Sequence, residues 1–414
     1  MPINNKNEIK EELAEDGSQI GIEAEPEENI LEPFDPNSIS IQTTPVAMDA
    51  LIRRLKQNSI NLAPDFQRSE VWDITRRSRL IESLMLNIPL PMFYVAADED
   101  GKWDVVDGLQ RLSTIRDFIS GDKEGKKLKL KNLEFLGKKF DGKTFDDIES
   151  NPAQIRLLNT IMETVMSFTV INPGTPEEVK RNIFKRINTG GMPLTPQEIR
   201  HALYQGQSSD LLMDLIMLPE FKAVMNRNIN DSRMGARELV LRFIAFLIFP
   251  IEYYKSDMDK FLSNAMRVVN CMPDMNSNRL SKIFKDESQP EIKLNQIQII
   301  KDKFILGMTR GKQLFSDHAF RKSLKGTQRK SPINKALFEA WSNVLCQLSK
   351  DEFDVLIAEK AILFELYQQK LDDNDFNNSI SRHATQTKGV LKRYEAINEI
   401  VGATLMAGKN DHSN

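Results

Sequence analysis

The chain has 414 residues, of which 40% are hydrophobic and 28% charged, and its mean hydropathy is -0.40. These values are typical of a polar globular protein and exclude a fibrous or collagen-like chain. The longest apolar run, LVLRFIAFLIF at 239–249, is interrupted by Arg242 and is shorter than the ~18 residues of a membrane span. The N-terminus lacks the apolar core of a secretory signal. We therefore expect a cytoplasmic protein without a membrane partner.

Charge is distributed unevenly along the chain. Residues 1–35 contain 11 acidic and 2 basic residues, a net charge of -9, whereas the remainder carries +6. Acidic segments with few aromatic residues are usually solvated, so we expect a disordered acidic tail over 1–35. A solubilising role explains it most simply, and an autoinhibitory or DNA-mimicking arm is the alternative. The mildly basic remainder permits contact with DNA without requiring it.

Cysteine and histidine residues are too few and too scattered for a disulfide framework or a zinc site. Cys271 and Cys346 form no CxxC pair, and the four histidines show no HExxH spacing. A nuclease of the His-Asn-His type needs a local histidine cluster, which this sequence lacks. We expect both cysteines to be small core residues.

The first half of the chain alternates strand and helix patterns. In chain order, we expect a short strand before Thr44-Pro45, a helix that starts there, a helix from Ile74 to about Asn87, a β-hairpin with strands 92–97 and 102–106, a helix from about Leu109, a strand at 164–174 and two helices within 175–191 and 194–206. Residues 120–155 are rich in lysine. They predict a surface insertion with one or two small strands, and their lysines favour a solvated face over a nucleic-acid patch.

The second half shows helix patterns almost exclusively. They cover 209–217, 236–249, 257–269, 293–310, 334–349, 351–369 and 387–405. The sequence therefore predicts the α+β class, with an α/β domain over 36–205, an all-helical domain over 206–405, and disordered tails at 1–35 and 406–414.

Three short polar stretches in the α/β part suggest a ligand site: PDFQR at 64–68, DGLQR at 107–111 and FKRINTGG at 184–191. In the second, a glycine at a strand-to-helix turn lets the backbone approach a ligand, and the helix N-terminus offers N–H groups and partial positive charge. This combination suits a phosphate. Arg111 can bind it bidentately, Gln110 can contact sugar or phosphate oxygens, and Asp107 can hold Mg²⁺ or position a water.

The residues alone leave a structural interpretation open. An Asp-Gly pair before a helix often forms a turn whose aspartate caps the helix, and Arg111 can belong to a salt-bridge network. Arg68 and Arg186 can likewise pair with carboxylates such as Glu70 or Glu198.

Together the stretches PDFQRSEVW, VVDGLQRLSTI and FKRINTGGMPLTPQEIRHALYQG resemble the domain of unknown function 262 family. That family comprises the N-terminal domain of GmrSD-type type IV restriction enzymes and is related in fold to ParB and sulfiredoxin. The resemblance covers about residues 40–210. It implies a ParB/sulfiredoxin-like domain whose Asp-Gly-Gln-Gln-Arg motif binds, and in several members hydrolyses, nucleoside triphosphates in bacterial anti-phage defence.

The resemblance also assigns site residues. It implies catalytic roles for Asp107, Gln110 and Arg186, nucleotide binding by Asp65, Gln67, Arg68, Gly108, Arg111 and Asn188, and Mg²⁺ binding by Asp107. Leu109 replaces the first glutamine of the family motif, and this departure weakens the case for catalysis more than for binding. Sulfiredoxin chemistry needs a cysteine in the glycine motif, which this chain lacks.

The predicted function is therefore a nucleotide-binding module of a defence or restriction-type system, with Mg²⁺-dependent NTP hydrolysis as its expected enzymatic activity. A non-catalytic DNA-binding protein with a degenerate nucleotide pocket is one alternative. A nuclease without histidine is another, and it needs a second carboxylate near Asp107. The expected partners are a nucleoside triphosphate, DNA, and a protein partner or nuclease subunit. The sequence does not predict the oligomeric state.

Overall fold

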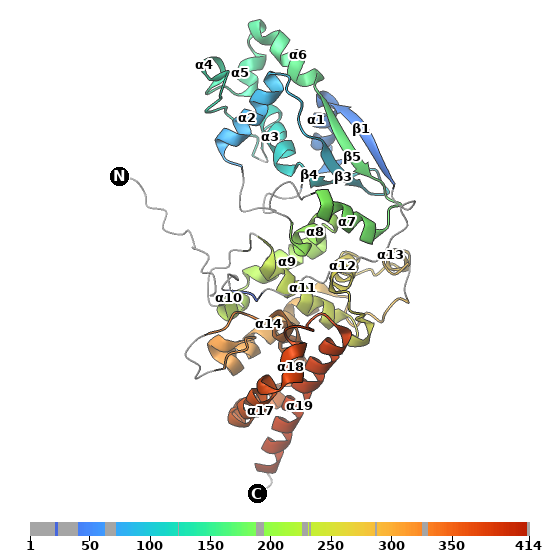
Figure 1. The fold of residues 1–414 in the computed structure, drawn as a ribbon, viewed down its shortest axis with the longest axis vertical. Helices are drawn as coiled ribbons and strands as arrows, with labels where there is room; N and C mark the ends of the chain where they lie inside the picture. Colours follow the sequence, from blue (N-terminus) through green and yellow to red (C-terminus); the bar gives the residue numbers. More distant parts are fainter. Residues whose placement is uncertain are drawn as a thin grey trace, which may run out of the picture. The chain divides into compact units, whose positions relative to one another are not determined.

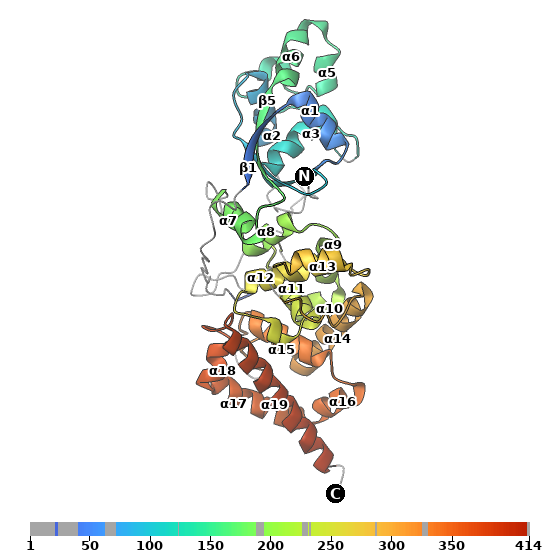
Figure 2. The ribbon, with the colours of Figure 1, turned by 90° about the vertical axis from the view of Figure 1, so that its right-hand side faces the viewer.

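The computed structural model describes residues 21–23, 40–62, 72–122, 124–187, 194–225, 231, 233–285, 288–324 and 330–411. The chain forms two compact units. One contains Glu32–Gln205 and is called the N-terminal unit below. The other contains Gly206–Asn414 together with Met1–Leu31 and is called the helical unit. Figures 1 and 2 show the elements of each unit from two directions.

The N-terminal unit is built on a mixed five-stranded sheet with the order β1-β5-β3-β4-β2 (Figure 1). The strands are β1 (Ile41–Ala47), β2 (Ile60–Asn61), β3 (Phe93–Ala97), β4 (Trp103–Asp107) and β5 (Val165–Ile171). β1 pairs with β5 and β3 with β4 in antiparallel fashion, whereas β3–β5 and β2–β4 are parallel pairs. This sheet and the helical second half confirm the predicted α+β class.

Helices cover both faces of this sheet. The main core lies between one face and the helices α1 (Met48–Lys56), α2 (Ile74–Met85), α3 (Leu109–Ile119) and α6 (Ile155–Glu163). Within this core, the rings of Phe93 and Phe168 stack with their centroids 5.1 Å apart. Trp72 packs against this core. A smaller core on the other face contains Phe184 and Ile199, from α7 (Glu177–Ile187) and α8 (Pro196–Leu203).

The predicted hairpin and the strand at 164–174 are confirmed by β3, β4 and β5. Two other expectations are wrong. No helix starts at Thr44-Pro45, because β1 continues through Pro45 to Ala47. β1 is an edge strand, where a proline can be accommodated despite its missing N–H. The lysine-rich insertion forms short helices instead of strands in its described part: α4 (Gly137–Phe140), α5 (Phe145–Glu149) and the 3-10 helix η3 (Pro152–Gln154).

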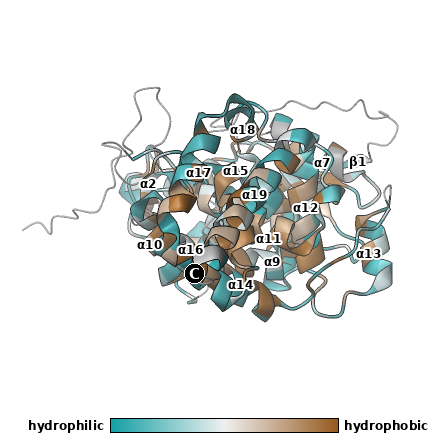
Figure 3. Cartoon of the chain, turned by 90° about the horizontal axis from the view of Figure 1, so that it is seen from below, coloured by the Kyte–Doolittle hydropathy of each residue, from teal (hydrophilic) through white to brown (hydrophobic). Residues whose placement is uncertain are grey.

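The helical unit packs around α11 (Gly235–Ile248). Every side chain from Ala236 to Ile248 is buried, and Figure 3 shows α11 as predominantly hydrophobic. The other helices are α9 (Gln207–Met217), α10 (Pro219–Met225), η5 (Ile251–Tyr253), α12 (Met258–Val269), α13 (Ser277–Ile283), α14 (Ile297–Phe315), η6 (Ser316–His318), α15 (Lys335–Leu345), α16 (Lys350–Ala358), α17 (Lys360–Asp372), α18 (Asn374–Ser379) and α19 (Thr387–Asp411). Within the described residues, none of the helices combines the length and apolarity that crossing a membrane requires.

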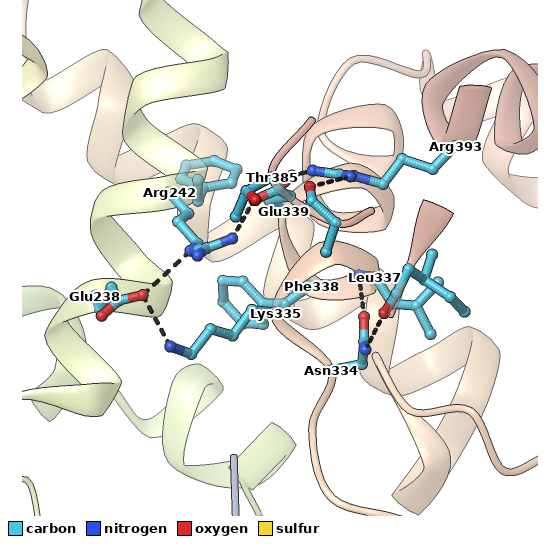
Figure 4. Close-up of polar contacts among 12 residues, drawn as sticks. Glu238, Arg242, Asn334, Lys335, Leu337, Phe338, Glu339, Thr385 and Arg393 are labelled. Atoms are coloured by element: carbon cyan, nitrogen blue, oxygen red, sulfur yellow. Dashed lines mark hydrogen bonds and ion pairs between the residues drawn. The ribbon is translucent and has the colours of Figure 1, made fainter. Parts of the chain in front are cut away.

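A buried ion-pair network joins three of these helices (Figure 4). Glu339 of α15 is fully buried, and its two carboxylate oxygens pair with Arg393 of α19 and with Arg242 of α11, the latter at 3.2 Å. Arg242 also contacts Glu238 at 3.3 Å, and Lys335 pairs with the same Glu238 oxygen at 2.9 Å. Each charge in the network therefore has an opposite charge beside it.

Residues Gly21–Glu23 also belong to the helical unit, although they lie within the segment expected to be a solvated tail. Ile22 forms a parallel β-bridge with Ile333, through hydrogen bonds from Glu23 N to Ile333 O and from Ile333 N to Gly21 O, both 2.8 Å. The Glu23 carboxylate contacts Lys322 Nζ at 2.6 Å and accepts a 2.8 Å hydrogen bond from Asn334. These three residues depart from the expected solvated tail.

Candidate functional site

The turn between β4 and α3 requires a glycine for two independent reasons. Gly108 has a φ of 96°, in the left-handed region that residues with a side chain rarely adopt. A Cβ at this position would also collide with the ring of Phe93, lying 2.9 Å from its Cε1 atom, and would lie 3.2 Å from Arg111 Nη2. Gly108 therefore allows the turn to pack directly on the edge of the main core.

The N-terminus of α3 carries no side-chain cap. Gly108 occupies the capping position, and the first turn of the helix contains no acidic residue. In contrast, Asp73 caps α2, and Thr195 forms a capping box with Glu198 at the start of α8. The backbone N–H groups of the first turn are donors that an α-helix cannot satisfy internally, so this terminus retains its capacity to bind an anion.

Arg111 ties this turn to the start of β3. Its guanidinium donates hydrogen bonds to the carbonyl oxygens of Pro91 and Met92, the latter at 3.2 Å, and contacts Asp107 Oδ2 at 2.8 Å. It also lies over the Phe93 ring, 4.5 Å from the centroid. Burial lowers the pKa of Arg111 from its usual value, and the charge of Asp107 opposes this effect. Arg111 therefore forms a salt bridge with the Asp107 side chain, as the structural interpretation of the sequence expects.

Two polar side chains at the turn can still bind a ligand. The Asp107 side chain is 37% exposed although it pairs with Arg111, whose side chain is only 11% exposed. Gln110 is partly buried, and its amide group forms no hydrogen bond within the part of the chain that the structure describes. A carboxylate and an amide are therefore the groups that a ligand at this turn would meet.

The side chains near Asp107 determine how the predicted Mg²⁺ could be held. Among the described residues, no group of three or more His, Cys, Asp or Glu side chains can hold a metal ion. Mg²⁺ is commonly held by one or two carboxylates together with substrate phosphates and waters. Asp107 fits that role only as one ligand beside a nucleotide. A histidine-free nuclease site, which needs further carboxylates, gains no support from this arrangement.

The structure brings together only part of the predicted site. Asp107, Gly108, Gln110 and Arg111 meet at the β4–α3 turn, as described above. Arg186 lies in α7 with an exposed side chain, and α7 packs on the opposite face of the sheet from α3. The predicted binding residues Asp65, Gln67, Arg68 and Asn188 lie outside the described residues.

Sequence reasoning missed the groups that support the turn from a distance. Phe93 packs under both Gly108 and Arg111, and the carbonyls of Pro91 and Met92 hold the guanidinium. These residues precede Arg111 by about twenty positions in the chain and carry no polar motif. The register of the β3–β4 hairpin is the signal that could have placed them there.

A second polar cluster lies on β4 and was also missed. Asn61 Nδ2 donates to Asp104 Oδ1 at 3.1 Å and to Gln205 Oε1 at 2.8 Å, joining β2, β4 and the end of the N-terminal unit. Burial raises the pKa of Asp104, and the hydrogen bond from Asn61 partly opposes this effect. The partners are 43 and 144 residues apart in the chain, so no local pattern reveals the cluster.

Residues 51–205 match the family model described as GmrSD restriction endonuclease, N-terminal domain. This part of the chain is similar to that family. The matched GmrSD N-terminal domain begins within α1, ends with the N-terminal unit, and includes the β4–α3 turn. The match confirms the family resemblance and suggests a restriction-type or phage-defence module. Among curated proteins, none matches the chain significantly.

Proposed function

We propose that the GmrSD N-terminal domain of this chain binds a nucleoside triphosphate at the β4–α3 turn. The observation that carries the proposal is the uncapped N-terminus of α3 behind the left-handed Gly108, with the exposed Asp107 carboxylate and the Gln110 amide beside it. Oriented N–H groups at a helix N-terminus and a glycine that permits close approach are what a phosphate group requires. The family match at the same residues supports this function.

Each residue of the turn has a distinct role in the proposal. The first-turn N–H groups and the Gln110 amide bind phosphate oxygens. Arg111 holds the turn against β3 and adds positive charge beside the phosphates, although its guanidinium already has protein partners. Asp107 accepts Mg²⁺ when the nucleotide brings it, and the ion neutralises phosphate charge.

The motif residues from the other two stretches complete the proposed site. In this proposal Asp65, Gln67, Arg68 and Asn188 contact the nucleotide, whereas Arg186, on α7 and on the opposite face of the sheet from α3, has no contact with the phosphates. Leu109 stands where the resembled motif has a glutamine, so an amide that could orient a water is absent from that position. We therefore propose chiefly that nucleotide binding controls a DNA or protein partner, and secondly that the bound nucleotide is hydrolysed.

Calorimetry with ATP, GTP, CTP and UTP in the presence of Mg²⁺ tests the proposal. We expect micromolar binding of at least one nucleotide to the full chain. Gln110→Ala should weaken it about tenfold, in line with the loss of one hydrogen bond to a charged group. Arg76→Ala is the matched control, since Arg76 is an exposed residue on α2. The proposal fails if no nucleotide binds the native chain, or if both variants weaken binding equally.

Phosphate release from the same samples then separates binding from turnover. If hydrolysis occurs, Asp107→Asn should reduce it more strongly than it reduces nucleotide affinity, because the carboxylate is proposed to hold the metal ion. Equal losses in rate and affinity would remove Asp107 from the metal role.

A further inference from the structure

The loop before α4 presents a phenylalanine to solvent. The side chain of Phe135 is 72% exposed, the highest value among the large hydrophobic residues that the structure describes. Its neighbours Leu133 and Leu136 pack against the main core of the N-terminal unit. The loop therefore packs Leu133 and Leu136 against the core and leaves Phe135 exposed.

A buried carboxylate fixes the backbone at this point. Glu82 of α2 is 3% exposed, and it accepts hydrogen bonds from the N–H groups of Glu134, Phe135 and Leu136 at 2.9, 2.8 and 2.7 Å. Burial alone would raise the pKa of Glu82, but these three hydrogen bonds together with the charge of Arg79 outweigh it and hold the pKa below its usual value. The outward position of Phe135 is thus built into the fold.

Two further contacts attach the same loop to α2. Ser78 Oγ accepts a 2.9 Å hydrogen bond from Lys131 N, and Asn132 Nδ2 donates to Thr75 Oγ1 at 2.9 Å. Side chains from three successive turns of α2 therefore hold residues 131–136 in place. An ordered loop can present an aromatic ring without the entropic cost of fixing it on binding.

Lysines flank Phe135 in the sequence. Lys131, Lys138 and Lys139 are exposed, and among the described residues none of them forms an ion pair. The nearby acids are engaged: Glu134 lies 3.9 Å from Arg79, and Asp141 accepts a hydrogen bond from the Leu133 N–H. The segment around Phe135 therefore carries more basic than acidic side chains, Lys131, Lys138 and Lys139 against Glu134 and Asp141.

We propose that Phe135, Lys131, Lys138 and Lys139 form a contact surface for single-stranded nucleic acid. Proteins bind single strands by stacking bases on exposed aromatic rings and by placing cations along the backbone. A protein partner would be expected to require a broader apolar centre than one exposed ring. The surface is separate from the β4–α3 turn, and the proposal does not depend on nucleotide binding there.

Fluorescence anisotropy with a labelled oligothymidine tests this surface in the full chain. We expect binding at low salt, and Phe135→Ala should weaken it about tenfold, as expected for the loss of one base–aromatic stack. Ile155→Ala is the matched control, because Ile155 is 64% exposed in the same unit. Circular dichroism confirms that both variants fold. Absence of binding to the native chain, or equal affinity of native chain and Phe135→Ala, overturns the proposal.

Salt dependence tests the lysines independently. Each lysine that contacts a phosphate of a single strand contributes ~0.7 to the slope of log affinity against log salt concentration. Substituting Lys131, Lys138 and Lys139 by alanine should therefore lower that slope by about two. An unchanged slope would remove the lysines from the surface. Nucleotide binding measured by calorimetry should be the same in Phe135→Ala as in the native chain, which separates this proposal from the one above.

Discussion

The arginine–carboxylate pairs of the helical unit and of the N-terminal unit differ in burial and in the number of partners. In the helical unit, Glu339 is fully buried, and two arginines from two other helices occupy both of its oxygens. In the N-terminal unit, the Asp107 side chain is 37% exposed and pairs with a single residue, Arg111, four positions later in the chain. The first arrangement locks helices together, whereas the second leaves a carboxylate accessible at the end of a helix.

This difference distinguishes charged groups that stabilise the fold from charged groups that can bind a ligand. Burying an ion is costly, so a buried carboxylate stabilises a fold only when its partners compensate the lost hydration. Glu339 meets that condition and has no capacity left for a ligand. Asp107 remains partly exposed, and the helix that follows it carries no side-chain cap, which is why we place the proposed function there.

Removing the charge of Glu339 should have the largest effect on stability. Glu339→Gln leaves Arg242 and Arg393 buried beside a neutral group, and we expect a loss of about 3–5 kcal/mol in the free energy of unfolding. Urea denaturation measures it. The control is Glu399→Gln, an exposed residue 2.7 Å from Lys370, which should cost less than about 1 kcal/mol. Equal losses in the two variants would contradict the structural role of the network.

Glu82 should show an intermediate effect with a defined pH dependence. Its pKa is held below the usual value in the folded state, so its stabilising contribution is present above the unfolded pKa of ~4.3 and is lost as the pH falls through the folded value. Glu82→Gln should therefore destabilise the chain by about 1–3 kcal/mol at neutral pH. The difference between the native chain and the variant should shrink below pH ~4. A difference that does not vary with pH would contradict this assignment.

Asp107→Asn should have the smallest effect on stability. The carboxylate is partly exposed, and Arg111 keeps its hydrogen bonds to the carbonyls of Pro91 and Met92, so we expect a loss below about 1 kcal/mol. The same urea experiment measures it. A loss as large as that of Glu339→Gln would show that both pairs are structural and would remove the contrast between the two units.

Much of the fold could be predicted because its elements carry clear periodic patterns. The β3–β4 hairpin and the seven long helix patterns of the second half are of this kind, although the pattern at 351–369 is divided by Glu359 into α16 and α17. Short helices such as α4, α10 and α18 have too few residues for a pattern to repeat. β1 was cut short in the prediction because Pro45 resembles a helix start, and only its edge position explains why the strand continues.

Only the part of the candidate site that lies within one short stretch of sequence was predicted. Asp107, Gly108, Gln110 and Arg111 lie within five consecutive residues, so their turn chemistry is visible in the sequence. Their supports, Phe93 and the carbonyls of the preceding loop, are positioned by strand pairing, which no short motif encodes. The same limit hid Phe135, whose outward position depends on Glu82 more than fifty residues earlier.

The bridge between Ile22 and Ile333 changes how the two units are connected. Because residues on both sides of Glu32–Gln205 belong to the helical unit, the N-terminal unit is an insertion within that unit instead of an appendage at its start. The inserted domain is thus covalently tethered at both ends. A single cleavage of the chain between Gln205 and Gly206 would leave the two units joined through the segment that follows Glu23.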